Sequence, residues 1–193
     1  MLIDRFLPSY DTTLVCETSI AASPDEAYAA MRETNLLDPV IKALFTLREL
    51  PLRIVRRLRR EPPPPPAPSK VTFGDLLQQG PIWVPLLEEP GLELVIGSVG
   101  RFWQKDYGAR QVGADDFIAF AEPGYAKLAL SLAVRPTATG SILRYEARTA
   151  TTDDAARRKF RRYWRIIAPG VALVMRRALR RIKVAAERPA VSV

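Results

Sequence analysis

The chain has 193 residues, of which 48% are hydrophobic and 26% are charged, a balance typical of folded globular proteins and unlike that of disordered chains. It contains one cysteine and no histidine, which excludes an internal disulfide and a metal site built from cysteine and histidine. Its net charge of +8 is concentrated near the C-terminus, because residues 153–193 hold 12 basic and 3 acidic residues, a net +9, which leaves −1 for the rest.

The first third of the chain predicts one strand followed by two helices. Residues 12–22 alternate between two sets of side chains, as a half-buried strand does. The sequence SPDE at 23–26 is a capping box, which predicts a helix that ends near Asn35. A second helix is predicted to start at Asp38 and to continue to about residue 58, with a bend or break at Pro51. Residues 62–70, with the run PPPPPAP, are interpreted as a proline-rich loop inserted into a single domain that spans residues 1–193.

From Val71 onwards the pattern predicts mainly strands, at residues 82–87, 92–97, 97–104, 126–135 and 142–151. The segment from Asp153 to Lys183 predicts one long, bent helix, because its apolar spacing stays in phase on both sides of Pro169. Its arginines are expected to be mostly solvated. Ile166 and Leu173 leave part of that outer face uncharged. A long helix on an antiparallel sheet is an α+β arrangement, and the space between the two layers is the expected ligand site.

This order of elements resembles the START/SRPBCC superfamily, the helix-grip fold of Bet v 1-like proteins and polyketide cyclases. The resemblance is carried by ETSIAASPDEAYAAM (17–31), LELVIGSVGRFW (92–103), FAEPGYAKLAL (120–130) and YEARTATTDDAARRKFRRYW (145–164). It is to an uncharacterised actinobacterial-type branch, in which Glu-Thr-Arg is expected where this chain has Glu146-Ala147-Arg148. The resemblance implies a curved antiparallel sheet wrapped around the C-terminal helix, with two shorter helices between the first and second strands. It also implies binding of apolar molecules.

The candidates for ligand contact are apolar and aromatic side chains that point inward from the sheet and the long helix. They are Trp83, Trp103, Leu128, Leu130, Leu132, Tyr145, Tyr163, Trp164 and Ile167. The same side chains would also form an ordinary packed core, so the pattern leaves both interpretations open. The primary hypothesis is a module that binds a hydrophobic or amphipathic small molecule, such as a lipid or a polyketide-like compound.

No catalytic motif, phosphate-binding loop or metal-ligand spacing is present, and no cofactor is expected. An alternative is an enzyme of the aromatase/cyclase kind, for which Tyr145 or Tyr163 would be the best inward-facing ionisable group. Glu17 is interpreted as a cross-strand partner of Arg144 or Arg148. Four residues in a turn-rich stretch could rim the ligand space, although solvated loop positions are the simpler account: Asp106, Tyr107, Asp115 and Asp116.

The basic helix adds a third hypothesis, a protein that acts at an anionic membrane surface. The apolar side chain of Leu173 is expected to be buried by another surface, and a second copy of the chain is one candidate. Nucleic acid is not expected as a partner, because the arginines are not interleaved with exposed aromatic residues. The N-terminal residues have no apolar signal core, and the longest uncharged apolar run is about half of a membrane span. The expected location is therefore the cytoplasm, with peripheral membrane association as an option.

Overall fold

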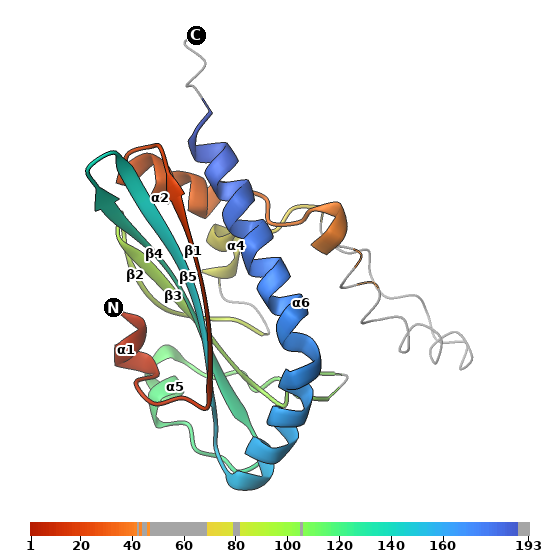
Figure 1. Ribbon diagram of the computed structural model, residues 1–193. Coiled ribbons are helices and arrows are strands. Elements are labelled where there is room, and N and C mark those ends of the chain that lie inside the picture. The colour runs from red at the N-terminus through yellow and green to blue at the C-terminus, as the bar shows by residue number, and fades with distance from the viewer. Residues whose placement is uncertain (42, 44–45, 47–68, 79–81, 105, 189–193) are drawn as a thin grey trace.

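The computed structural model describes residues 1–41, 43, 46, 69–78, 82–104 and 106–188, and Figure 1 shows how they are arranged. The strands are β1 (Thr12–Ile20), β2 (Val84–Glu89), β3 (Glu93–Gly100), β4 (Ala126–Thr137) and β5 (Gly140–Thr151). The helices are α1 (Ile3–Phe6), α2 (Pro24–Glu33), α4 (Phe73–Leu76), α5 (Ala114–Ala119) and α6 (Asp154–Ala186). The proline run at 62–68 and most of the helix predicted from Asp38 lie outside the described residues.

The strands form one antiparallel sheet in the order β1-β5-β4-β3-β2. In the β1–β5 pair Glu17 lies opposite Arg144, whose Nη1 donates to the Glu17 carboxylate at 2.6 Å, as predicted. The two strands expected at 92–97 and 97–104 are instead one strand, because β3 pairs with β4 continuously from Glu93 to Gly100. One antiparallel sheet with a long C-terminal helix packed on it confirms the predicted α+β class.

Local sequence signals start the two main helices where they were predicted. The Ser23 hydroxyl accepts from the Glu26 N–H and the Glu26 carboxylate accepts from the Ser23 N–H, so a complete capping box begins α2. Asp153 caps α6 by accepting from the Ala156 N–H at 2.8 Å. α6 continues through Pro169 as one helix, and Pro169 lies on its exposed side.

One face of the sheet carries the main core, which α6 and α2 cover (Figure 1). The C-terminal half of α6 contributes four fully buried side chains to it: Met175, Ala178, Leu179 and Ile182. They pack with the sheet and with α2, chiefly against Ile20, Met31, Leu94, Ile96, Leu130, Leu132, Leu143 and Tyr145. The apolar stripe predicted for the long helix therefore faces the sheet.

The opposite face of the sheet is also buried, which strand alternation alone did not indicate. α1 and α5 lie on this outer face (Figure 1), where Ile3, Phe6 and Phe117 pack against Val95 and Val99. Both short helices were absent from the prediction. As a result every residue of β3 is buried, including those on the side away from α6.

Strand alternation also places three charged side chains on this outer face, where the N-terminal segment with α1 shields them from solvent. Glu93, Glu146 and Arg148 are only 6%, 2% and 7% exposed. The Glu93 carboxylate accepts from the Leu2 N–H and from the Ser131 hydroxyl, at 2.9 and 2.6 Å. Arg148 donates to Glu146 at 2.7 Å, and it also donates to Asp4 and to the Leu7 carbonyl. Buried charges persist only with such partners, so this network ties the N-terminal segment to the sheet.

Candidate functional site

The side chains predicted to contact a ligand fall into two groups. Leu130, Leu132 and Tyr145 are 8%, 0% and 8% exposed and belong to the core between the sheet and α6. The other six are only half-buried: Trp83, Trp103, Leu128, Tyr163, Trp164 and Ile167. Core packing therefore accounts for the first group, and the second is the one with surface to offer a ligand.

Five of these six half-buried side chains pack against one or both of two hydrophobic clusters that meet along α6. The larger cluster is the main core around Met175, and the smaller one is formed by Phe102, Ala126 and Phe160. Leu128 packs against both clusters, so it is the point at which they join. Trp164 stacks on Phe160 with ring centroids 5.7 Å apart. The middle of α6 thus spans the junction between the clusters with its apolar side chains incompletely covered.

Tyr145 adds a polar atom to this apolar surrounding. Its ring meets Phe73 edge-on, with centroids 5.5 Å apart, and lies in the core on the face that α6 covers. Burial raises the pKa of Tyr145, so the hydroxyl stays protonated at neutral pH. No hydrogen bond joins this hydroxyl to any of the residues that the structure describes. It is therefore an available donor and acceptor.

The turn-rich stretch contributes little to this surface. Asp106, Asp115 and Asp116 are exposed. Asp115 and Asp116 begin α5, which lies on the outer face of the sheet and so does not border the space between sheet and α6. Only Tyr107 is half-buried, packed against the smaller cluster with a positive φ of 59°.

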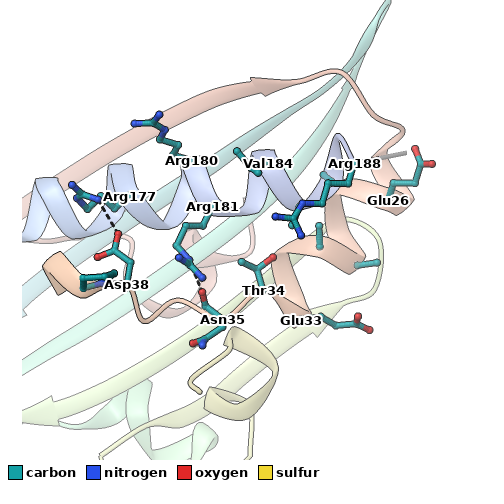
Figure 2. Close-up of a pocket in the computed structure, with 15 residues that line it drawn as sticks. Glu26, Glu33, Thr34, Asn35, Asp38, Arg177, Arg180, Arg181, Val184 and Arg188 are labelled. Carbon is teal, nitrogen blue, oxygen red and sulfur yellow. Dashed lines mark hydrogen bonds and ion pairs between the residues drawn. The ribbon is translucent and has the colours of Figure 1, made fainter. Parts of the chain in front are cut away.

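A separate hollow, the α2–α6 groove, was not predicted. It has a volume of about 870 Å³ and lies between α2, the chain that follows it, and the C-terminal half of α6 (Figure 2). Its lining combines charged side chains with small apolar ones: Glu26, Ala29, Ala30, Glu33, Thr34, Asn35, Asp38, Pro39, Arg177, Arg180, Arg181, Val184, Ala185, Ala186 and Arg188. The helical spacing of the arginines was visible in the sequence. The approach of residues 33–39 to them is a tertiary contact that no local pattern signals.

One ion pair and one hydrogen bond join the two walls at one end of this groove. Arg177 Nη1 donates to Asp38 Oδ2 at 3.0 Å, and Arg181 Nε donates to the Asn35 carbonyl at 2.7 Å (Figure 2). Burial opposes ionisation of Asp38, yet hydrogen bonds from the Ile41 N–H and from Arg177 hold the pKa of this carboxyl below its ordinary value. Asp38 is therefore charged at neutral pH and neutralises Arg177.

Within the described ranges, no group of three or more acidic or cysteine side chains could hold a metal ion. Over the same part of the chain, no helix combines the length and the apolar character needed to cross a membrane.

The architecture around these sites is the helix-grip arrangement: α2 follows the first strand, an antiparallel sheet comes next, and a long C-terminal helix lies across one face. The chain is similar to several solved structures, among them the following three. Protein MLL2253 of Mesorhizobium loti has 14% identity and a TM-score of 0.42, with 93% of this chain and 100% of that chain covered. An AHSA1-like protein of Rhizobium etli has 16% identity and a TM-score of 0.38, with 92% and 83% covered. A norcoclaurine synthase from Thalictrum has 12% identity and a TM-score of 0.37, with 92% and 96% covered.

The fold itself follows from the strand order and the position of α6. No family model matches the chain, and no curated protein matches it.

Proposed function

We propose that this protein binds a hydrophobic or amphipathic small molecule between the sheet and the middle of α6. The observation that carries the proposal is the half-buried apolar group around Leu128, which lies between two well-packed clusters. Apolar surface left open between packed regions is stabilised when an apolar ligand covers it, at roughly 25 cal/mol for each Å² removed from water. The group includes two tryptophans from the sheet side and Trp164 from the helix, which supply large contact areas.

Tyr145 supports a ligand that carries one polar end. The Tyr145 hydroxyl lies among apolar side chains, and a ligand oxygen that accepts from it would use the donor that this side chain presents. An amphipathic molecule with a carbonyl, hydroxyl or carboxylate near its buried end has the required chemistry. The raised pKa of Tyr145 suits a hydrogen-bond donor better than a base.

Two consecutive isoleucines of α6 that differ in burial provide the test. Ile167 is half-buried on the sheet side, whereas Ile166 is 81% exposed on the outer side. Oleate and a fluorescent apolar probe are titrated into the purified protein and followed by tryptophan fluorescence and calorimetry. We expect Ile167→Asp to abolish binding and Ile166→Asp to leave it unchanged, with Ile167→Ala as a milder variant, and circular dichroism confirms that each variant folds.

Lipid extraction and native mass spectrometry of protein purified without added ligand complete this test. An apolar compound that co-purifies with the wild type and is lost from the Ile167→Asp variant supports the proposal. If neither oleate nor the probe binds the wild-type protein and nothing co-purifies, the proposal is wrong.

The outer face of α6 favours a second candidate function, association with an anionic membrane surface. Ile166 is 81% and Leu173 is 39% exposed, and the nearby Arg162, Arg165 and Arg176 are exposed as well. Apolar side chains flanked by arginines are the pattern of an interfacial helix. Sedimentation with phosphatidylserine-containing vesicles checks it: binding should weaken with added salt and disappear in Leu173→Asp. Equal binding of the variant would contradict this function.

A further inference from the structure

The α2–α6 groove contains guanidinium groups whose donors are not used by the protein. Arg181 donates only through Nε, to the Asn35 carbonyl, so its two terminal nitrogens have no partner among the described residues. Over the same residues Arg188 has no hydrogen bond or ion pair, and neither has the hydroxyl of Thr34. Figure 2 shows Arg181 and Arg188 reaching from the α6 side towards Thr34, at the end of α2. Two cationic forks and a hydroxyl therefore converge on one hollow.

The acidic side chains of the groove do not cancel this charge. Asp38 is paired with Arg177, and Glu26 is committed to the N-terminus of α2 through the Ser23 N–H and hydroxyl. Among the described lining residues this leaves Glu33 against Arg180, Arg181 and Arg188. Arg177 adds to the excess of donors, because its buried Nε has no acceptor. The part of the groove around Arg181 and Arg188 is thus cationic.

We propose that the α2–α6 groove is a binding site for a phosphate monoester. Two guanidinium forks and a hydroxyl supply more donors than the two oxygens of a carboxylate can accept, whereas the three terminal oxygens of a phosphate match them. The volume of about 870 Å³ exceeds what a phosphate group fills and has room for an organic substituent. Ala29, Val184 and Ala185 supply an apolar wall for that part of the molecule.

This site is distinct from the proposed apolar site, because the two share no lining residue. The same phosphate chemistry occurs in soluble esters and in the headgroup of phosphatidic acid. The experiment therefore uses both sources. Phenyl phosphate is titrated by calorimetry, and phosphatidylcholine vesicles with and without phosphatidic acid are used in sedimentation. Benzoate serves as the carboxylate comparison.

Two variants remove the proposed donors and one matched variant does not. Arg188→Gln and Arg181→Gln are each expected to weaken phenyl phosphate binding about tenfold or more, the effect of one lost charge-assisted hydrogen bond. Arg176→Gln removes the same charge from an exposed position of α6 outside the groove and should leave the affinity within about twofold. Circular dichroism confirms folding of each variant. Arg188 is exposed.

The two ligand sources and the control give separate outcomes. Binding of phenyl phosphate alone, sensitive to Arg188→Gln, identifies a soluble ester; binding of phosphatidic acid vesicles with the same sensitivity identifies a lipid headgroup. The proposal is overturned if the wild type binds neither source, if benzoate binds as tightly as phenyl phosphate, or if Arg176→Gln weakens binding as much as Arg188→Gln. Because oleate binding at the sheet-facing site does not use these arginines, failure here leaves that function standing.

Discussion

At the scale of single residues, Arg144 shows how burial decides the worth of an ion pair. It donates to Glu17 at 2.6 Å and to Glu146 at 2.9 Å, so the two contacts are similar in length. The Glu17 side chain is 47% exposed, whereas that of Glu146 is 3% exposed. Water screens the first carboxylate and replaces its partner when the pair is broken. The second carboxylate is shielded from water, and its removal takes a buried acceptor from both Arg144 and Arg148.

The two glutamates of Arg144 therefore give a matched pair of variants. Glu146→Gln should lower the free energy of unfolding by about 3 kcal/mol, because it breaks a buried pair with both Arg144 and Arg148. Glu17→Gln should cost less than about 1 kcal/mol, as exposed pairs do. Urea denaturation followed by tryptophan fluorescence measures both. Equal costs would show that the coverage by α1 does not matter to these charges.

At the scale of secondary-structure elements, Asp153 joins the beginning of α6 to the turn before β4. Its carboxylate accepts from the Ala156 N–H inside the helix and from the Gly124 N–H outside it. These backbone hydrogen bonds hold the pKa of Asp153 below its ordinary value. One side chain thus satisfies an otherwise free helix donor and fixes where the long helix starts against the sheet.

Asp153→Ala should lower the melting temperature by several degrees, because it removes the N-cap of α6. The neighbouring Asp154→Ala is the control, because that residue is 78% exposed and pairs only with Arg157; it should cost less than about 0.5 kcal/mol. Thermal unfolding followed at 222 nm measures both. A larger loss for Asp154→Ala would contradict the assignment of Asp153 as the cap.

The elements that local rules identify were predicted, and those that distant contacts create were not. Three patterns depend only on residues that are close together in the sequence, so they could be recognised there. They are the capping box at Ser23, the alternation of β4 and the apolar stripe of α6. α1 has only four residues, too few for a periodic pattern, and its N-terminal donors are satisfied by Glu93, about 90 residues away. The sequence predicted two strands where β3 is one, because Gly97 was interpreted as a bend. In the structure, the lack of a side chain at Gly97 makes room for the side chains of Phe117 and Leu86. Tertiary packing determined each of these.

At the scale of the whole molecule, the same distinction applies to the two sites. The half-buried aromatic residues were predicted as ligand contacts because hydrophobic periodicity places them on the inner face. Periodicity could not distinguish them from Leu130 and Leu132, which are buried in the core. The α2–α6 groove depends on where residues 33–39 pass α6, and that is set by the packing of α2 on the sheet. Helical spacing alone placed Arg177 and Arg181 on one face without indicating what would lie opposite.

The molecule's charges also set how its stability depends on pH. Among the described residues, eight carboxyl groups with partners have a pKa below the ordinary value: Asp4, Asp11, Glu26, Asp38, Asp75, Glu146, Asp153 and Glu187. A lowered pKa in the folded state means that the unfolded chain binds more protons in acid, so the stabilisation is present above the unfolded value of about 4 and is lost as the pH falls through the folded values. The chain has no histidine, the side chain that ordinarily titrates between pH 5 and 8.

The free energy of unfolding should therefore be level from about pH 5.5 to 8 and should fall steadily below about pH 4.5. Urea denaturation across this range measures it, and the Glu146→Gln variant should show a shallower decline because one of the contributing carboxyl groups is gone. A slope of more than about 1 kcal/mol per pH unit between pH 6 and 8 would require a titrating group other than these eight carboxyl groups. A maximum of stability in acid would contradict the stabilising role of the carboxylates. It would mean that the folded protein is more stable when protonation has broken the ion pairs of these carboxylates with Arg144, Arg148, Arg157 and Arg177.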